Sequence, residues 1–379
     1  MDNYISLYIH IPFCKSKCLY CDFTSFDNMN QKMRPYVLAL CEEIKQYGEF
    51  LYDKKVDTVF IGGGTPTVLP LVLMEKILKT LQESFKFSSS LEFTIESNPG
   101  TLNKDMLHLL KENKINRLSI GLQATQNKLL KSIGRIHNLE DFDNNYHLAR
   151  KIGFKNINVD LIFSLPKQTL KDWASSLEYL VKIEPEHISC YSLIIEEDTP
   201  FGKLKSEGRL SEASEDSDRD MYHYARNFLQ ENKYKHYEIS NFSKASFESR
   251  HNLNCWEYKP YLAMGLGGHS FFNGERYHNC YDLEKYIDSK GKIEDIKEDI
   301  EKIPLAMQYS EYMFLGLRLI EGISIKEFES RFKISFDKLF GDKVKKLVEM
   351  QLLIKDGNNI RLSTKGLDLS NIVFAEFLL

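Results

Sequence analysis

Three cysteines crowd into one short loop near the start of this 379-residue chain and restrict what that loop can do. Cys14, Cys18 and Cys21 follow C-x3-C-x2-C spacing, directly after an apolar run, Tyr4 to Ile11, that predicts a buried strand ending at Pro12. Thiolates held this close repel one another and oxidise easily, whereas a metal ion or cluster keeps them deprotonated. Because the whole chain has only seven cysteines, the crowding predicts a metal-binding loop.

Two kinds of metal site fit such a loop. Three sulfurs can hold three corners of a cubane iron–sulfur cluster and leave one iron open to a ligand that the protein does not supply. Zinc is the alternative, with His10 or a distant residue as the fourth ligand. The spacing differs from that of four-cysteine electron-transfer clusters, so it predicts a metal without deciding which one.

The composition narrows the class of protein. Hydrophobic residues make up 42% of the chain and charged residues 27%, which is ordinary for a globular protein, and the length allows one large domain and one small domain. A net charge of −4 gives no reason to expect nucleic acid or an anionic membrane as partner. The sequence shows neither a membrane span nor the pattern of a signal peptide. Together with the odd number of cysteines, this predicts a cytoplasmic protein with at most peripheral membrane contact.

Strand-like and helix-like stretches alternate along the first half of the chain. After the first strand, apolar runs predict five further strands at 56–61, 91–96, 115–120, 156–163 and 187–193. Apolar residues at three- and four-residue steps predict helices at 34–50, 71–85, 103–110, 139–152 and 170–183. This alternation predicts parallel strands with the chemistry in the loops at their carboxyl ends.

Candidate binding residues fall at those carboxyl ends. Besides the cysteine loop, they are the turn 62–65, Glu96, Gln123, Asp160 and Tyr191. The glycines of the turn leave backbone groups open to a ligand, because a side chain would block its approach. Glu96, near the end of a buried strand, needs a partner, and Asp160 taken alone fits a helix cap or a salt bridge equally well. Their common position predicts one shared site.

The rest of the chain predicts a second, smaller unit. Residues 203–217 read as a polar linker and a helix start, 234–239 as an edge strand, and 292–302 as a solvated segment. Helices at 305–319, 325–332 and 336–351, two short strands at 353–355 and 360–362 and a last helix from 363 predict a winged-helix-like domain. We therefore expect three regions, 1–205, 206–300 and 301–379. Acidic residues are mixed with the lysines of 336–351, so no nucleic-acid partner is expected.

The string that runs from Tyr8 through His10 to Cys14, with the two cysteines that follow, resembles the radical S-adenosylmethionine (SAM) superfamily. Within that superfamily it resembles the branch of oxygen-independent coproporphyrinogen III dehydrogenases and HemW-type haem chaperones, over nearly the whole chain. The resemblance implies a partial (β/α)6 TIM-like barrel with an α-rich, winged-helix-like carboxyl-terminal domain. It also implies a [4Fe-4S] cluster on the three cysteines, with one iron open to SAM.

The same resemblance implies a SAM site. The implied contacts are Tyr8 near the cluster and sulfonium, Tyr20 beside the adenine, Gly63, Gly64 and Thr65 at the amino group, Glu96 at the methionyl part, Gln123 and Asp160 at the ribose hydroxyls, and Arg135 at the carboxylate. A guanidinium suits the last position, because it is a planar, two-pronged donor. From the residues alone, Tyr8 fits core packing equally well.

A second motif resembles the His-Asn-x-x-Tyr-Trp pattern of the haem chaperones. His251 stands at the position implicated in haem binding, and Trp256 ends the motif, but Cys255 replaces the tyrosine. Histidine, tyrosine and cysteine can all ligate haem iron. The resemblance therefore implies His251 as haem ligand, with Cys255 as a second candidate. The implied partners are haem, haem-acceptor proteins and an electron donor such as flavodoxin or ferredoxin.

Two departures separate this chain from the dehydrogenases of the branch. Phe23 stands where they carry a fourth cysteine, and the first strand begins at Tyr4, without the segment that precedes it in those enzymes. Both features favour a haem chaperone with no catalytic residue of its own. The alternatives are a coproporphyrinogen III dehydrogenase, which would decarboxylate its substrate oxidatively with a 5′-deoxyadenosyl radical, and a zinc-stabilised winged-helix regulator.

Overall fold

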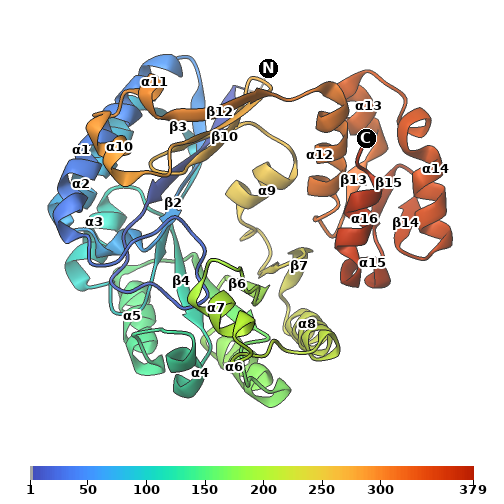
Figure 1. Cartoon of the computed structure of the whole chain (residues 1–379), viewed down its shortest axis with the longest axis horizontal. Helices are drawn as coiled ribbons and strands as arrows, with labels where there is room; N and C mark the ends of the chain where they lie inside the picture. Colours follow the sequence, from blue (N-terminus) through green and yellow to red (C-terminus); the bar gives the residue numbers. More distant parts are fainter. Residues whose placement is uncertain (1–2) are drawn as a thin grey trace.

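Six parallel strands form the centre of one large sheet in the order β1-β2-β3-β4-β5-β6 (Figure 1). The computed structural model describes residues 3–379. Residues 1 and 2, which belong to the amino-terminal stretch where no signal-peptide pattern was found, lie outside the described residues. The strands are β1 (Tyr4–Ile11), β2 (Lys55–Gly63), β3 (Lys86–Ser97), β4 (Arg117–Gln123), β5 (Ile157–Phe163) and β6 (His187–Ser192). All six predicted strands are present.

Helices connect these strands in the predicted alternation. They are α1 (Asn30–Phe50), α2 (Leu71–Ser84), α3 (Lys104–Glu112), α5 (Leu139–Ile152) and α6 (Leu170–Ile183), with two short additions that the sequence did not predict, η1 (Pro66–Val68) and α4 (Asn127–Ser132). Asn138 and Thr169 begin α5 and α6 with capping boxes, which fix where these helices start. The predicted TIM-like partial barrel is confirmed, and its sheet is open at both edges.

Side chains alternate along the central strands, so that one face of the sheet is apolar and the other polar. On β1, Leu7 and Ile9 are fully buried in the core. On the other face, Asn158 of β5 donates hydrogen bonds to the Ser119 hydroxyl and the Asp160 carboxylate, both at 2.8 Å, and accepts one from His187 at 2.6 Å. A polar network of this kind is stable only when its groups are paired. The barrel interior is therefore built to carry polar groups.

Strands from residues 206–302 extend this sheet at both edges. The strands β8 (Asn241–Ser243) and β7 (Lys235–Glu238) add to β6, and β9 (Tyr261–Met264), β10 (His269–Phe272), β11 (Glu275–Asn279) and β12 (Lys297–Lys302) add to β1. The helices of this region are α7 (Pro200–Ser206), α8 (Glu215–Glu231), α9 (Arg250–Trp256), α10 (Leu283–Asp288) and α11 (Ile293–Ile296). The division of the chain at 205 and 300 stays a prediction.

The charged segment 292–302, which we expected to be solvated, is largely exposed and forms α11 and the edge strand β12. Ile296 is fully buried and anchors the segment, while Glu298 pairs with Lys285 at 2.5 Å. Lysine and glutamate are common on exposed edge strands, where they discourage pairing with other chains. Composition alone did not distinguish such a strand from a loop.

The carboxyl-terminal part forms a separate domain with the predicted winged-helix order of elements. These are α12 (Leu305–Gly316), β13 (Ile323–Ser324), α13 (Ile325–Phe332), α14 (Phe336–Glu349), β14 (Leu353–Asp356), β15 (Asn359–Leu362), α15 (Thr364–Asp368) and α16 (Ser370–Glu376). Phe328, Phe336 and Phe340 pack edge to face in its core. The predicted last helix is divided at Leu369 into α15 and α16. Among residues 3–379, no helix is long and apolar enough to cross a membrane.

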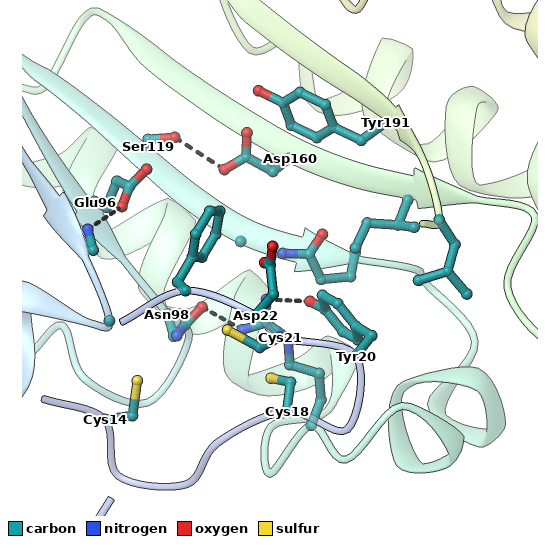
Figure 2. Close-up of a pocket in the computed structure, with 18 of the residues that line it drawn as sticks. Cys14, Cys18, Tyr20, Cys21, Asp22, Glu96, Asn98, Ser119, Asp160 and Tyr191 are labelled. Carbon is teal, nitrogen blue, oxygen red and sulfur yellow. Dashed lines mark hydrogen bonds between the residues drawn. The ribbon is translucent and has the colours of Figure 1, made fainter. Parts of the chain in front are cut away.

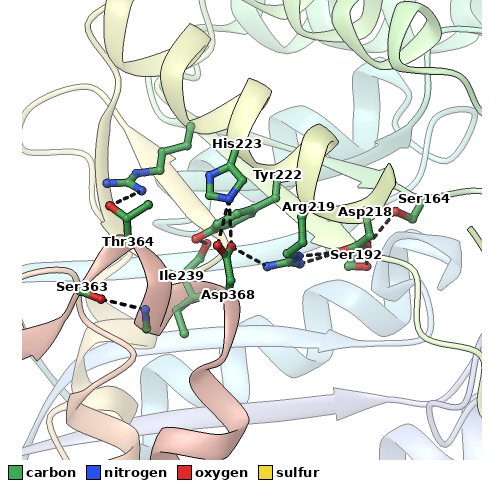
Figure 3. Close-up of polar contacts among 12 residues, drawn as sticks. Ser164, Ser192, Asp218, Arg219, Tyr222, His223, Ile239, Ser363, Thr364 and Asp368 are labelled. Atoms are coloured by element: carbon green, nitrogen blue, oxygen red, sulfur yellow. Dashed lines mark hydrogen bonds and ion pairs between the residues drawn. The ribbon is translucent and has the colours of Figure 1, made fainter. Parts of the chain in front are cut away.

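Asp368 connects the carboxyl-terminal domain to the barrel (Figure 3). Its carboxylate lies 3.5 Å from Arg219 and 3.0 Å from His223, both on α8. Arg219 also pairs with Asp218, which accepts a hydrogen bond from Ser164 after β5 at 2.7 Å. A chain of polar contacts therefore runs from the end of a barrel strand, through α8, to α15.

Replacing Asp368 with Asn should loosen the carboxyl-terminal domain without unfolding it, because the amide cannot form an ion pair with Arg219. Partly exposed ion pairs are worth about 1 kcal/mol or less. Amide hydrogen exchange in α15 should therefore quicken by up to about fivefold, while exchange in α5 stays unchanged. Asp356→Asn, at the exposed tip of the wing, is the matched control. Equal exchange in the two variants would show that Asp368 does not hold this interface.

Candidate functional site

A cavity of about 370 Å³ opens at the carboxyl ends of the central strands, and the cysteine loop lies over it (Figure 2). Eleven of the predicted site residues line this strand-end cavity: Cys14, Cys18, Tyr20, Cys21, Gly63, Gly64, Glu96, Gln123, Arg135, Asp160 and Tyr191. They come from the cysteine loop, from strands β2 to β6 with the turn after β2, and from the loop after α4. The structure thus brings together residues that are spread over much of the barrel sequence.

The glycine turn after β2 forms one wall of this cavity. A Cβ atom on Gly64 would lie 2.9 Å from Cys14 Sγ and 2.6 Å from the Phe13 carbonyl oxygen, and one on Gly62 would lie 2.7 Å from Glu96 Oε2. Gly63 adopts φ +112° and donates its N–H to Glu96 Oε2 at 3.1 Å. Side chains are excluded here because the cysteine loop and Glu96 pack directly against the backbone.

Two carboxyl groups give this cavity its electrostatic character. Burial, with the charge of Asp160, raises the pKa of Glu96 to about 8. Asp160 accepts a hydrogen bond from Ser119 at 2.9 Å (Figure 2). It accepts another from Asn158 at 2.8 Å. Two acids that share a buried site favour a cation between them. A ligand with an ammonium or sulfonium group meets that requirement.

Arg135 supplies the opposite charge in the same cavity. It donates hydrogen bonds to Asn98 Oδ1 and, at 3.2 Å, to the Tyr20 hydroxyl, while Asn98 donates to Thr65 Oγ1 at 2.7 Å. Arg135 Nε and Gln123 Oε1 are buried and have no hydrogen-bond partner among residues 3–379. Polar atoms left unpaired in a cavity are expected to meet a ligand. The cavity therefore offers separate groups for an anionic and for a hydroxyl-bearing part of one molecule.

The three cysteines are free thiols of intermediate exposure on the same cavity. Burial raises the pKa of the Cys14 thiol, the Thr65 hydroxyl 3.8 Å away opposes that shift, and negative charge on Cys21 adds to it. Metal binding would remove this mutual repulsion. Within residues 3–379, no three histidine, cysteine or acidic side chains are gathered closely enough to hold a single metal ion. Three free thiols on one cavity are a donor set for a metal centre, as the sequence predicts.

His10 is not available as a fourth zinc ligand, which corrects the alternative drawn from the sequence. Its Nε2 lies 2.7 Å from the Thr24 carbonyl oxygen, which can only accept, so Nε2 carries the proton. Its Nδ1 then accepts from the Tyr8 hydroxyl at 3.1 Å. Both ring nitrogens are used inside the protein.

Tyr8, His251 and Cys255 do not reach the strand-end cavity. They line a second cavity of about 480 Å³, together with Tyr261, His269 and Tyr281 among others. We call it the α9 cavity, because His251 and Cys255 lie on that helix, which packs against β2 and against α12 of the carboxyl-terminal domain (Figure 1). The cysteine-loop residues Asp22 and Phe23 line both cavities and form a wall between them.

The imidazole of His251 is held with one nitrogen open. Its Nδ1 lies 2.8 Å from Thr58 Oγ1, and its ring packs against Phe60 with centroids 5.2 Å apart. No group among residues 3–379 is hydrogen-bonded to its Nε2. Burial lowers the pKa of His251 to about 3, so the ring is neutral near pH 7. A neutral imidazole with a free Nε2 is the form that binds a metal.

Glu92 anchors the start of α9, a role that the sequence did not reveal. Its carboxylate accepts the backbone N–H groups of Arg250 and His251, each at 2.9 Å. A carboxylate at a helix amino terminus satisfies N–H groups that have no partner within the helix. Glu92 and Glu96 lie four residues apart on one strand and thus on the same face, the only sequence signal that could have found this contact.

Other residues of the two cavities were also missed. They are Asn98 and Ser119 in the strand-end cavity and Thr58 behind His251. Ser119 lies between apolar neighbours in a fully buried strand, so its alternation with Leu118 and Ile120 was a usable signal. Asn98, in a Ser-Asn-Pro-Gly turn, looked like an ordinary turn residue. Thr65, one of the predicted residues, lies beside the cavity, with its hydroxyl 3.8 Å from Cys14.

Comparison with known proteins agrees with this geometry. Residues 8–180 match the radical SAM superfamily, and residues 303–369 match the HemN C-terminal domain. The chain is 37% identical over 374 residues to the heme chaperone HemW of Lactococcus lactis, which covers 99% of this chain and 97% of that protein. It belongs to the HemW family. The HemW of Bacillus subtilis is 38% identical over 374 residues, covering 98% of this chain and 99% of that one.

A solved structure shares the fold of this HemW-family chain. The radical SAM enzyme coproporphyrinogen III oxidase (HemN) from Escherichia coli superposes with a TM-score of 0.86 at 22% identity, over 99% of this chain and 90% of that one. At this level of identity the likeness concerns the fold. The partial barrel with its separate carboxyl-terminal domain is therefore a fold common to this chain and to that enzyme.

Glu96 should make SAM binding depend on pH. With a pKa of about 8, the unliganded carboxyl group is protonated near pH 7, whereas a bound cation favours its ionised form. Binding should then release a proton, and affinity should rise between about pH 6 and pH 8 by at most about tenfold per pH unit. Titration calorimetry of the reconstituted protein in buffers of different ionisation enthalpy measures that proton directly.

Glu96→Gln should abolish both the proton release and the pH slope. Glu43→Gln is the control, because Glu43 is also fully buried, has a pKa raised by burial to about 7, and binds the Gly265 N–H away from both cavities. If the SAM affinity of Glu96→Gln changes with pH as steeply as that of the unmodified protein, a group other than Glu96 binds the cation.

Proposed function

We propose that this protein is a cytoplasmic haem chaperone that holds a [4Fe-4S] cluster, SAM and haem, and that passes haem to acceptor proteins. The observation that carries the proposal is the pair of cavities on either side of the cysteine loop. One is lined by three free thiols and by groups suited to a charged nucleoside, and the other by a neutral histidine with an open nitrogen. The curated relatives named heme chaperone HemW support it.

The residues of the strand-end cavity fit the cluster and SAM. Cys14, Cys18 and Cys21 would hold three irons of the cluster. When bound, the cluster and SAM together supply one-electron chemistry at the sulfonium. The part of the protein is to bind and orient, with no catalytic residue of its own.

Each polar side chain of the strand-end cavity is proposed to bind a different part of SAM. Glu96 and the Gly63–Thr65 backbone would receive its cationic amino end, and Arg135 its carboxylate, to which a guanidinium can donate two parallel hydrogen bonds. Gln123, with an unpaired Oε1, and Asp160 would take the ribose hydroxyls, with Tyr20 beside the adenine. Tyr8 is not among these groups, because it lines the other cavity, where its hydroxyl is bonded to His10.

Haem is assigned to the α9 cavity through His251. A cavity of about 480 Å³ is within the usual size range of small-molecule sites. The side chain of Phe23, at the position of a fourth cysteine in the dehydrogenases, is 63% exposed between the two cavities. A porphyrin ring would cover such an apolar surface, and this supports a carrier of haem within porphyrin metabolism.

The proposed partners follow from this chemistry. Acceptor proteins must take haem from the α9 cavity, and a one-electron donor such as flavodoxin or ferredoxin must reduce the cluster. Nucleic acid is not among the partners, because α14 carries Asp337, Asp342 and Glu349 among its lysines.

Cys18→Ala should remove the cluster and spare the barrel. The side chain is half-buried on the cavity wall, so its truncation leaves little cavity in the core. Iron and acid-labile sulfide should fall to background after anaerobic reconstitution, while the far-ultraviolet circular dichroism stays that of the unmodified protein. Cys41→Ala, at a buried cysteine of α1, should keep its iron. Full iron content in Cys18→Ala would contradict the proposed cluster site.

Haem titration of the anaerobically reconstituted protein, with coproporphyrinogen III turnover measured in parallel, tests the function. We expect stoichiometric haem uptake and no turnover. His251→Ala should weaken haem binding by more than about tenfold and leave the iron–sulfur content unchanged. His108→Ala, at an exposed histidine of α3, is the control. Turnover without haem uptake would favour a dehydrogenase, and unchanged affinity in His251→Ala would remove the ligand assignment.

A further inference from the structure

We propose that haem in the α9 cavity is held between two histidines, with His269 as the axial ligand opposite His251. This inference rests on the proposed haem-binding function and assigns a second ligand to the same site. Both side chains line the one cavity, although 17 positions and a glycine-rich turn separate them in the sequence.

The two imidazoles reach the cavity from different elements. His251 lies in the first turn of α9, which is fixed by Glu92, and His269 begins β10, on the sheet extension beyond β1. A six-coordinate haem iron needs its axial ligands on opposite faces of the ring. Two ligands from separate elements of one cavity can meet that requirement.

His269 has the same local arrangement as His251, with one nitrogen bonded and the other open. Its Nε2 lies 2.7 Å from the Tyr281 hydroxyl, and no group among the described residues 3–379 is hydrogen-bonded to its Nδ1. With the proton on Nε2, the ring donates to Tyr281 and its Nδ1 lone pair is free. A hydrogen bond on the far nitrogen is the usual device that orients a metal-binding histidine.

The neighbourhood of His269 holds the ring neutral and in place. Burial, with the charges of His278 and Arg276, lowers the pKa of His269. The His278 ring packs against it with centroids 5.1 Å apart. Gly267, at φ +63°, lets Tyr281 approach, since a Cβ there would lie 2.9 Å from the tyrosine ring. Tyr281 is therefore free to take up its position beside His269.

Cys255 cannot take this place. It lies four residues after His251 on the same helix, so both side chains point to the same side of the cavity. A helix face can supply one axial ligand to a ring but not both. Burial also raises the pKa of the Cys255 thiol to about 12, whereas thiols bind metals as thiolates.

Several other histidine and tyrosine side chains in or beside the cavity are already engaged. His10 uses both ring nitrogens, and the Tyr8 hydroxyl donates to His10. The Tyr281 hydroxyl is bonded to His269. His278, although it stacks on His269, is bonded through Nδ1 to the Asn279 carbonyl oxygen and through Nε2 to Asp299, each at 3.0 Å. Among these groups, only His269 offers an open nitrogen.

Ferric haem titrated into the full-length protein tests the assignment, with electron paramagnetic resonance and resonance Raman spectra as the readout. The unmodified protein should give a six-coordinate, low-spin spectrum. His269→Ala should convert it to a high-spin spectrum and weaken binding by about tenfold or more. Added imidazole should restore the low-spin spectrum in His269→Gly. His108→Ala, at an exposed histidine of α3, is the control and should stay low-spin.

The outcomes separate this inference from the function on which it rests. If the unmodified protein binds no haem, the proposed function fails. If it binds haem with a high-spin spectrum, or if His269→Ala stays low-spin, haem binding stands and the second ligand is wrong.

If His269→Ala does not fold, chemical labelling of the unmodified protein tests whether His269 binds haem. His269 is exposed and should react with diethyl pyrocarbonate, as should the exposed His108 of α3. Bound haem should protect His269 and leave His108 reactive, as measured by peptide mass spectrometry. Equal labelling of His269 with and without haem would overturn the inference.

Discussion

Backbone hydrogen bonds between the cysteine loop and the glycine turn hold the strand-end cavity together. Gly64 donates its N–H to Ile11 at 2.9 Å and Thr65 to Phe13 at 2.8 Å, so the pairing of β1 with β2 continues beyond both strands. The loop closes on itself where Cys14 donates to the Phe26 carbonyl at 2.9 Å. Because Gly64 has no side chain, Cys14 can lie directly against the turn. The contact between the cysteine loop and the glycine turn therefore positions both the cysteines and the open backbone groups.

Most of the barrel could be predicted because its signals are local. The predicted ranges of α5 and α6 agree with the observed bounds, since their capping boxes and apolar periodicity lie within each segment. The shared cavity followed from a rule of topology, that the carboxyl ends of parallel strands meet at one edge. That rule does not predict which atoms are in contact. The Asn98 amide, for example, donates to Thr65 and accepts from Arg135, and neither hydrogen bond was predicted.

What the sequence did not reveal depends on contacts between distant segments. Glu92 and the backbone of His251 are 159 positions apart, and the shared strand face of Glu92 and Glu96 does not indicate which distant segment Glu92 contacts. The edge strand β12 has no apolar face of its own and is ordered by pairing with β11. The family resemblance implied Tyr8 near the cluster and sulfonium, with core packing as the alternative. The alternation of β1 instead directs its side chain, with that of His10, toward the α9 cavity.

The two cavities share one wall, which Asp22 and Phe23 form. Both residues follow Cys21 directly, so a metal bound at that sulfur would fix the backbone from which they project. A ligand that packs against Phe23 from the α9 side must in turn restrict the loop that carries the cysteines. Any such coupling acts equally in both directions, because it is one free energy shared by two binding events. A carrier whose loading site and cofactor site share a wall can therefore make the release of one molecule depend on the state of the other.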